Sequence, residues 1–246
     1  MGNPISYLGA TLSWNGKQPT GYSKGGTNVT YAYNEDGLRT QKTHNGTTTN
    51  YYYNGSVLIG MQSGNAVQRF SYDAQGKVVS VNYNGTEYYY LRNAQGDIVK
   101  LIDGNRNTVV EYTYDSWGKL LAATGSLATS LGANQPFRYR GYVYDGETGW
   151  YYLQTRYYDP NTCRFISSDV YLSTGQGVIG HNSYAYCLNN PVNMFDANGE
   201  IAILTCVLIG LAVGAVAGAS YGAYSSNKNI CFFIFEREHH FNFQIA

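Results

Sequence analysis

Four-residue turns of the pattern Asx-x-x-Gly recur along the first half of the chain and constrain its fold more than any other feature. They occupy residues 34–37, 73–76, 93–96 and 115–118, and their glycines lie 39, 20 and 22 residues apart. A degenerate unit stands near 53–55. The Asx side chain accepts hydrogen bonds from nearby backbone N–H groups, and glycine takes the left-handed conformation, so each turn indicates a β-hairpin. A period near 20 residues predicts a repeat array in which each unit buries its face against its neighbours.

Tyrosine-rich segments supply the predicted strands of these hairpins. Three of the four turns follow a strand in which aromatic residues alternate with small ones, at 31–33, 70–72 and 112–114. The chain of 246 residues contains 26 Tyr and 29 Gly, and 13% of its residues are charged. Tyrosine favours half-buried strands, where its ring packs and its hydroxyl reaches a partner. We therefore expect a mainly β fold. An unrelated β-sandwich is the alternative, but turns in step with aromatic pairs favour a hairpin strip.

Charge and ligand spacing exclude several classes of function. Lys and Arg number 16, as do Asp and Glu, so no basic surface for nucleic acid is indicated. The four cysteines form no Cys-x-x-Cys pair, and they do not combine with the four histidines at a zinc-ligand spacing. The sequence indicates no metal, no cofactor, no nucleic-acid partner and no small-molecule substrate.

A dense run of Tyr, Gly, Arg and Asp follows the hairpins. It includes Tyr-Tyr-Asp-Pro at 157–160, Arg-Phe-Ile-Ser-Ser-Asp at 164–169 and Asn-Asn-Pro at 189–191. This segment closely resembles the RHS repeat-associated core of bacterial polymorphic toxins, and the hairpins before it resemble YD repeats, over roughly residues 1–200. The resemblance implies a strip of hairpins that spirals into a hollow shell around a toxin domain, with the core as its plug.

The resemblance divides the chain into four parts. We expect YD-repeat hairpins over 1–134, the RHS core over 135–200, an apolar helix over 201–227 and a remnant of a variable toxin region over 228–246. The last part is too short for a catalytic domain. The expected function is that of a C-terminal shell and plug fragment, which encapsulates or presents an effector that is itself missing or truncated. Its expected partners are the rest of a longer shell or its own toxin segment, at a secreted or cell-envelope location.

Members of this family often cut themselves after the core with paired acidic side chains, which implies a second, enzymatic function. One carboxylate activates water while another, protonated, donates to the scissile bond. The positions that match the family motifs are Asp159 and Asp169, with Arg164 expected to orient a carboxylate. The cut would fall in the segment that contains Asp196, Gly199, Glu200 and Ile201.

Departures from the family pattern argue against cutting. They stand at Cys163, Val170, Ala197 and Glu200, where the family usually has Gly, Pro, Pro and an apolar residue. The last two fall in the expected scissile turn, so we expect the chain to stay whole. In the alternative to catalysis, the acids pair with arginines. We expect such pairs with Asp145, Asp159, Asp169 or Asp196, or stacking on rings, for four arginines of the segment: Arg138, Arg140, Arg156 and Arg164.

The tail changes composition abruptly. Residues 201–227 carry no charge over 27 positions, and about 20 apolar residues suffice to cross a bilayer. Small residues on one face favour close helix packing in lipid. Glycines recur at every fourth position, at Gly210, Gly214, Gly218 and Gly222. We expect one long helix that can insert into a membrane over 201–223. A buried linker helix and a Gly/Ala link remain alternatives.

A third function stays open on the aromatic residues. Exposed tyrosines together with Trp14, Trp117 and Trp150 could form a carbohydrate- or cell-binding surface. Aromatic side chains at alternate strand positions are more often part of a core.

Overall fold

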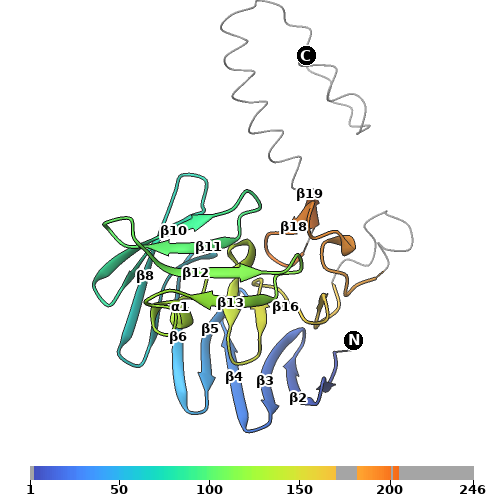
Figure 1. Cartoon of the computed structure of the whole chain (residues 1–246). Coiled ribbons are helices and arrows are strands. Elements are labelled where there is room, and N and C mark those ends of the chain that lie inside the picture. Colours follow the sequence, from blue (N-terminus) through green and yellow to red (C-terminus); the bar gives the residue numbers. More distant parts are fainter. Residues whose placement is uncertain (1–2, 170–181, 201, 205–246) are drawn as a thin grey trace, which may run out of the picture. The chain divides into compact units, whose positions relative to one another are not determined.

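The computed structural model describes residues 3–169 and 182–200 and the backbone of 202–204. Its main element is one antiparallel sheet of 13 strands, β1 to β13, in which every strand pairs with the next along the chain. A four-stranded sheet and a two-stranded sheet follow in the core segment, residues 135–200 and the strand just after it (Figure 1). The expectation of a mainly β hairpin fold is confirmed.

The hairpin sheet, as we call β1–β13, is built from short strands of two to eight residues. Their bounds are β1 (Ser6–Tyr7), β2 (Ala10–Asn15), β3 (Gln18–Lys24), β4 (Thr27–Tyr33), β5 (Arg39–His44), β6 (Thr47–Asn54), β7 (Val57–Ser63), β8 (Ala66–Tyr72), β9 (Val78–Tyr83), β10 (Thr86–Arg92), β11 (Ile98–Ile102), β12 (Thr108–Tyr114) and β13 (Leu120–Thr124).

Each Asx-x-x-Gly turn joins two consecutive antiparallel strands, as expected. At 73–76, the Asp73 carboxylate accepts backbone hydrogen bonds from Gln75 (3.0 Å) and Lys77 (2.8 Å), and Gly76 has a φ of +77°. A turn that the spacing did not reveal lies at 103–106, where Arg106 takes the left-handed position (φ +67°) in place of glycine. The opposite ends of the hairpins close with two-residue turns such as Asn84-Gly85, both with positive φ.

The tyrosine that directly precedes an Asx-x-x-Gly turn lies at a β-bulge. The register shifts between Ala32 and Tyr33, between Ser71 and Tyr72 and between Thr113 and Tyr114. A bulge bends its strand and increases the local twist. Because the bulges recur at the same end of successive hairpins, they curve the sheet in one direction (Figure 1).

The tyrosine at the bulge also links one repeat to the previous one. Its hydroxyl donates a hydrogen bond to a backbone carbonyl 14 to 16 residues earlier. These bonds join Tyr33 to Pro19, Tyr53 to Arg39, Tyr72 to Leu58 and Tyr114 to Ile98. A phenylalanine would fill the same space but leave the carbonyl unpaired, which explains why the repeat uses tyrosine.

A short helix, α1 (Leu131–Asn134), leads from the hairpin sheet into the core segment, which forms small strands. The elements of the core segment are the 3₁₀ helix η1 (Tyr139–Gly141), β14 (Val143–Asp145), β15 (Trp150–Tyr152), β16 (Tyr157–Asp159), β17 (Arg164–Phe165), the 3₁₀ helix η2 (Cys187–Asn189), β18 (Met194–Asp196) and β19 (Ala202–Leu204). Strands β18 and β19 pair in antiparallel fashion with Asp196 opposite Ala202, so Gly199 and Glu200 of the expected cleavage region lie in the loop between the two strands.

The inner face of the hairpin sheet is covered by the core segment. Leu12, Val29 and Tyr31 of the early strands form one buried cluster with Trp150 and Tyr157. Later strands form a second buried cluster that includes Leu131 and Phe137 of the chain's entry into the core. The core segment therefore fills the concave side of the curved sheet within residues 3–200 (Figure 1).

The last Asx turn fits closely against the core tyrosines. Gly118 has a φ of +87°, and a Cβ there would lie 2.4 Å from the Tyr139 ring. The hydroxyls of Tyr151 and Tyr158 donate to the carbonyls of Gly118 and Trp117, both at 2.7 Å. This turn needs glycine both for its backbone conformation and for the approach of the ring.

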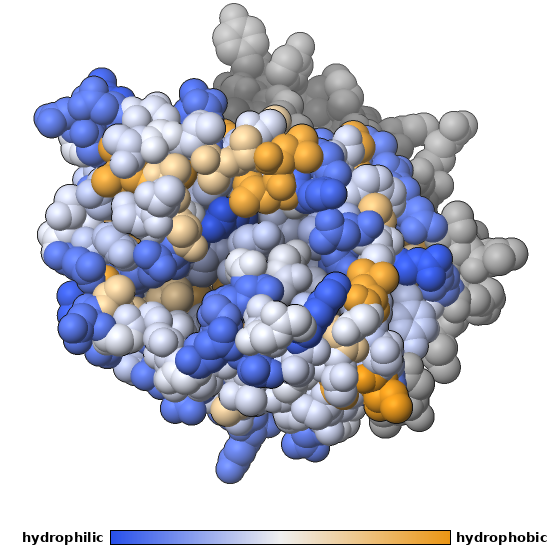
Figure 2. Space-filling view, turned by 60° about the horizontal axis from the view of Figure 1, so that its bottom comes forward, coloured by the Kyte–Doolittle hydropathy of each residue, from blue (hydrophilic) through white to orange (hydrophobic). Residues whose placement is uncertain are grey.

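The apolar helix expected over 201–227, with its glycines, and the remnant over 228–246 lie outside the described residues. Within the part that the structure describes, no helix is long and apolar enough to cross a membrane. The three tryptophans belong to the packing: Trp150 is 3% exposed, and Trp14 and Trp117 pack against buried clusters. The face seen in Figure 2 is mainly hydrophilic, with separate hydrophobic patches.

Candidate functional site

Asp145, at the end of β14, holds the core segment to the hairpin sheet through a buried charge cluster. Its carboxylate and the guanidinium of Arg39 are both fully buried, and they form a bidentate pair in which Arg39 Nη2 lies 3.1 Å from Asp145 Oδ1. Lys42 Nζ donates to the same Oδ1 at 2.9 Å and to Glu147 Oε2 at 2.9 Å. Two cations of strand β5 therefore meet an acid that follows them by about a hundred residues.

Tyrosine rings enclose this cluster. The Arg39 guanidinium lies 4.6 Å from the centroid of Tyr51 and 4.5 Å from that of Tyr152, an arrangement that favours a cation over an aromatic face. Burial alone would raise the pKa of Asp145, but Arg39 and Lys42 outweigh it and hold that pKa below its usual value. Asp145 is therefore ionised at neutral pH, and the cluster is a structural ion pair.

A second cluster forms around Arg156, just before β16. Arg156 Nη1 lies 2.8 Å from Asp169 Oδ2, and Nη2 lies 3.3 Å from Asp196 Oδ2. The remaining nitrogen, Nε, donates to the carbonyl oxygen of Gly199. The guanidinium also stacks on Phe165, with its central carbon 3.6 Å from the ring centroid. One arginine thus brings two acids and the expected scissile turn together.

Asp196 shapes that turn with its side-chain carboxylate. Its Oδ1 accepts hydrogen bonds from the N–H groups of Gly199 (2.8 Å) and Glu200 (3.0 Å), and Tyr142 donates to its carbonyl at 2.6 Å. Gly199 has a φ of +83°, and a Cβ there would lie 2.7 Å from Thr155 Oγ1. Burial raises the pKa of the Asp196 carboxyl, and Arg156 and the backbone donors oppose that rise. Asp196 is therefore buried, oriented and easier to protonate than an exposed aspartate.

The two acids expected from the sequence lie in different surroundings. Asp169 belongs to the Arg156 cluster, whereas Asp159 accepts from the Tyr7 hydroxyl (3.0 Å) and from the Asn161 backbone N–H (2.9 Å). The acid that the structure brings together with Asp169 is Asp196, which the sequence suggested as part of the cleavage region and as a possible partner of an arginine. The family motif indicated Asp159, in the Tyr-Tyr-Asp-Pro run, as the second acid. Asp196 instead reaches the Arg156 cluster because it lies in the β18–β19 hairpin, about 40 residues after Arg156.

The orienting arginine is also a different one. The side chain of Arg164 is exposed and forms no ion pair with a described residue, because on the short strand β17 it points away from the packed face. Arg156 makes the contacts with acids that were also expected of Arg164. Arg138 stacks on the Tyr112 ring at 4.6 Å, as expected, whereas Arg140 lies 3.7 Å from Asp97, which is not one of the four acids expected as partners.

Sequence reasoning missed Arg39 and Lys42. The only available signal was a pair of basic residues in a strand directly after an Asx turn, and nothing in the sequence shows that both face inward. Among the described residues, no group of three or more His, Cys, Asp or Glu side chains is placed to hold a metal ion.

Comparisons with known proteins agree with this architecture. The family model described as Teneurin YD-shell matches residues 20–192. The tRNA3(Ser)-specific nuclease WapA of Bacillus spizizenii is 37% identical over 207 residues, which are 81% of this chain and 9% of that protein. Toxin protein Tse5 of Pseudomonas aeruginosa is 41% identical over 73 residues, 30% of this chain and 5% of that protein. The chain thus spans less than a tenth of these curated relatives.

The fold recurs in a solved toxin complex. The crystal structure of TcdB2-TccC3 without its hypervariable C-terminal region matches with a TM-score of 0.63 at 24% identity. The match covers 78% of this chain and 10% of that chain. At this identity the likeness concerns the fold.

Proposed function

Since the chain belongs to the Teneurin YD-shell family, we propose that it forms the closing end of a larger toxin shell that encloses or presents a C-terminal effector. In this proposal residues 1–134 are a section of the shell wall, and residues 135–200 are the plug that ends it. Residues 201–227 link the plug to a variable toxin region, of which 228–246 are a remnant. The whole acts at a secreted or cell-envelope location as part of a longer protein.

The observation that carries this proposal is the way in which the sheet ends. Thirteen strands follow one another without a crossover, and the next segment of chain covers their inner face. Strands β1 and β13 each pair with one neighbour among the described strands, so both outer edges can accept further hairpins. A wall that can be extended and a filled inner face suit a container better than an enzyme with an open active site.

A chimera tests the enclosure. We would replace the part of Bacillus spizizenii WapA that aligns with residues 20–192 by those residues, and digest the native protein with proteinase K. The proposal predicts that the C-terminal region of the chimera resists digestion as long as the repeats do, and that Asp145→Asn shortens this protection. Digestion of that region at the rate of the same segment expressed alone would contradict enclosure.

A second candidate function, self-cleavage, is favoured by the Arg156 cluster. The carbonyl of Gly199 accepts from Arg156 Nε, which withdraws electrons from the carbon that water would attack. The amide nitrogen of Glu200, which would leave, donates to Asp196 Oδ1 at 3.0 Å. Both sides of the Gly199–Glu200 bond therefore contact groups that can assist hydrolysis.

In this candidate reaction the Asp169 side chain, which contacts Arg156, takes a proton from water as the water attacks the Gly199 carbonyl. Asp196, in its protonated form, gives a proton to the Glu200 nitrogen as the peptide bond breaks. The products are a carboxylate at Gly199 and a new amino terminus at Glu200. The raised pKa of Asp196 suits the role of proton donor, so cutting should be faster in mild acid than in mild base.

Intact mass over several days tests this candidate. The departures at Ala197 and Glu200 predict that the chain stays whole over days at neutral pH, since a displacement of 1 Å can cost about 100-fold in rate. A break beside Glu200 that Asp169→Asn and Asp196→Asn abolish, and that Asp159→Asn leaves unchanged, would support it. A single intact chain at both pH 5.5 and pH 8 would reject it and leave the cluster a structural role.

A further inference from the structure

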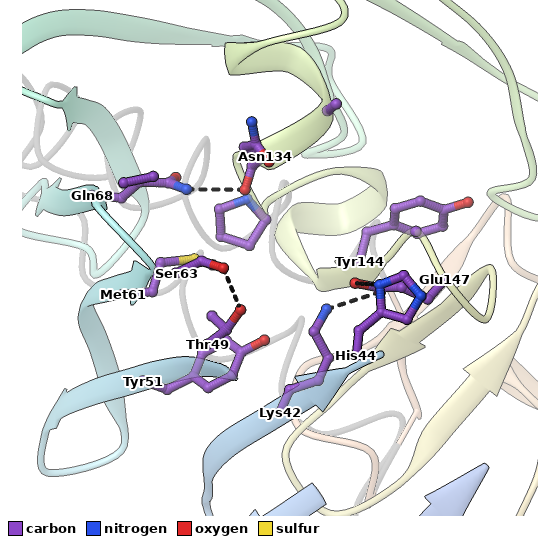
Figure 3. A pocket seen from close by; sticks show the side chains of 14 residues that line it. Lys42, His44, Thr49, Tyr51, Met61, Ser63, Gln68, Asn134, Tyr144 and Glu147 are labelled. Carbon is purple, nitrogen blue, oxygen red and sulfur yellow. Dashed lines mark hydrogen bonds and ion pairs between the residues drawn. The ribbon is translucent and has the colours of Figure 1, made fainter. Parts of the chain in front are cut away.

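A polar cavity of about 380 Å³ lies between the inner face of strands β5 to β8 and the core segment (Figure 3). It lies beside the Asp145 cluster and is separate from the Arg156 cluster. Its wall includes side chains from both parts of the molecule. Among them are Lys42, Tyr51, Ser63, Gln68, Tyr144 and Glu147.

Gln68 supplies the observation that points to a ligand. The residue is 3% exposed, and its Nε2 donates to the Asn134 carbonyl at 3.0 Å (Figure 3). Its Oε1 is buried and makes no hydrogen bond to any residue that the structure describes. A buried acceptor without a partner costs about 1–3 kcal/mol. Because Gln68 lines the cavity, a hydroxyl group of a bound ligand would satisfy this oxygen.

The charged groups of the wall pair with one another. Lys42 and Glu147 contact each other at 2.9 Å, and His44 Nδ1 lies 3.7 Å from the other oxygen of Glu147. The second carboxylate that Lys42 contacts, Asp145, is paired with Arg39. A phosphate or carboxylate would be attracted by Lys42 but repelled by Glu147. A cation would be attracted by Glu147 but repelled by Lys42. The cavity therefore favours a ligand without net charge.

Hydroxyl groups line the same space. Thr49 donates to Ser63 Oγ at 3.0 Å, which leaves the Ser63 hydroxyl proton free to donate into the cavity (Figure 3). The Tyr51 oxygen accepts from Arg39 at 3.2 Å and can donate its own proton. Together with Gln68 Oε1 the wall thus offers both donors and an acceptor, which a ligand rich in hydroxyl groups can match.

Apolar surface completes the match. Met61 and Pro136 and the ring of Tyr144 line the cavity beside these polar groups. The C–H face of a sugar ring packs against surface of this kind, while its hydroxyls reach the polar groups. A volume of about 380 Å³ lies within the range of 300–1,000 Å³ that is usual for small-molecule sites.

A bound peptide fits less well, because the backbone of the wall is already used. Strand β6 pairs with β5 and β7, and β7 pairs with β8, so none of these strands offers a free edge. Peptides that add to a sheet require such an edge.

From these features we propose that this cavity binds a neutral polyol, one monosaccharide unit in size, with Gln68 Oε1 accepting one of its hydroxyl protons. The site is distinct from the tryptophan surface that the sequence suggested. It depends on the fold of residues 40–147 and not on the shell function.

Saturation-transfer NMR with the full chain tests the proposal. The probes are glucose, galactose, mannose and N-acetylglucosamine, with galacturonate and a neutral tripeptide as alternatives of other chemistry. We expect at least one neutral sugar to receive saturation, and neither alternative to do so.

Variants locate the binding. Ala66→Phe fills the cavity from β8 and should abolish the signal, whereas Ser71→Phe places the same ring on the exposed face of that strand and should keep it. Gln68→Met removes the acceptor at similar size and should weaken binding about tenfold. If Ala66→Phe does not fold, judged by circular dichroism, the comparison of Gln68→Met with Ser71→Phe decides.

Three results would overturn the proposal. The first is that no neutral sugar binds to the wild type. The second is that a sugar binds Gln68→Met as tightly as the wild type, which would place it elsewhere. The third is that galacturonate or the tripeptide binds and the neutral sugars do not, which would assign the cavity another class of ligand.

Discussion

The hairpin sheet and the core segment are held together by different kinds of interaction. In the sheet, stabilising contacts repeat locally: Asx turns, bulges and tyrosine hydroxyls that reach 14 to 16 residues back. In the core segment the decisive contacts join residues about 40 to 106 positions apart, as in Arg39–Asp145 and Arg156–Asp196. The contacts of a periodic structure can be predicted from the spacing of its residues. The contacts of the core segment join residues far apart in the sequence, and no spacing indicates them.

The largest expected effect comes from removing the acid that joins the two regions. Asp145→Ala leaves Arg39 and Lys42 buried without their shared carboxylate, and breaking a buried pair in this way costs about 3–5 kcal/mol. Urea unfolding followed by tryptophan fluorescence measures it. The matched control is Asp36→Ala, an exposed acid in an Asx turn, which should change stability by less than about 0.5 kcal/mol. Equal effects would mean that the cluster does not join the regions.

The same acid gives the fold a pH dependence. Because the pKa of Asp145 is lower in the folded than in the unfolded state, its stabilisation is present above the unfolded pKa of about 3.9 and is lost as pH falls through the folded value. The difference in melting temperature between wild type and Asp145→Asn should therefore be constant near neutral pH and shrink below pH 4. A difference that grows with acid would contradict the sign of this shift.

Two arginines of the core segment offer a matched comparison. Arg156→Gln removes the contacts to Asp169, Asp196 and the Gly199 carbonyl, and should cost about 1.5–3 kcal/mol. Arg164→Gln changes an exposed side chain and should cost little. Hydrogen exchange at the Gly199 and Glu200 amides should quicken in the first variant alone. Equal losses of stability and equal exchange rates in both variants would show that the contacts of Arg156 do not stabilise the turn at Gly199 and Glu200.

The smallest expected effect belongs to one tyrosine hydroxyl of the sheet. Tyr53→Phe loses the bond to the Arg39 carbonyl and should cost about 0.5–1.5 kcal/mol. Tyr52→Phe, on the exposed face of the same strand, should be neutral. Thermal unfolding of the two variants measures the contrast, and a neutral Tyr53→Phe would show that ring packing alone joins successive repeats.

The sequence predicted the sheet well and the charge clusters only partly. Asx turns and alternating tyrosines are local, so the β fold followed from them, and the resemblance to RHS and YD-repeat proteins is confirmed by the family match. The turn at 103–106 escaped because its left-handed residue is Arg106. The sequence did not predict that Asp196 lies near Asp169, because both acids are brought together by Arg156 and by the β18–β19 hairpin. It also did not predict the buried position of Arg39, because no local pattern shows that this side chain points inward.

A double-mutant cycle between Arg39 and Asp145 tests most directly whether buried charge locks the core segment onto the hairpin sheet. The cycle compares Arg39→Ala, Asp145→Ala and the double variant by urea unfolding. Residues in direct contact couple by about 0.5–3 kcal/mol, and for this fully buried bidentate pair we expect a value of about 2–3 kcal/mol. Additive effects, with a coupling below about 0.5 kcal/mol, would contradict the account, because the two regions would then be held together by packing alone.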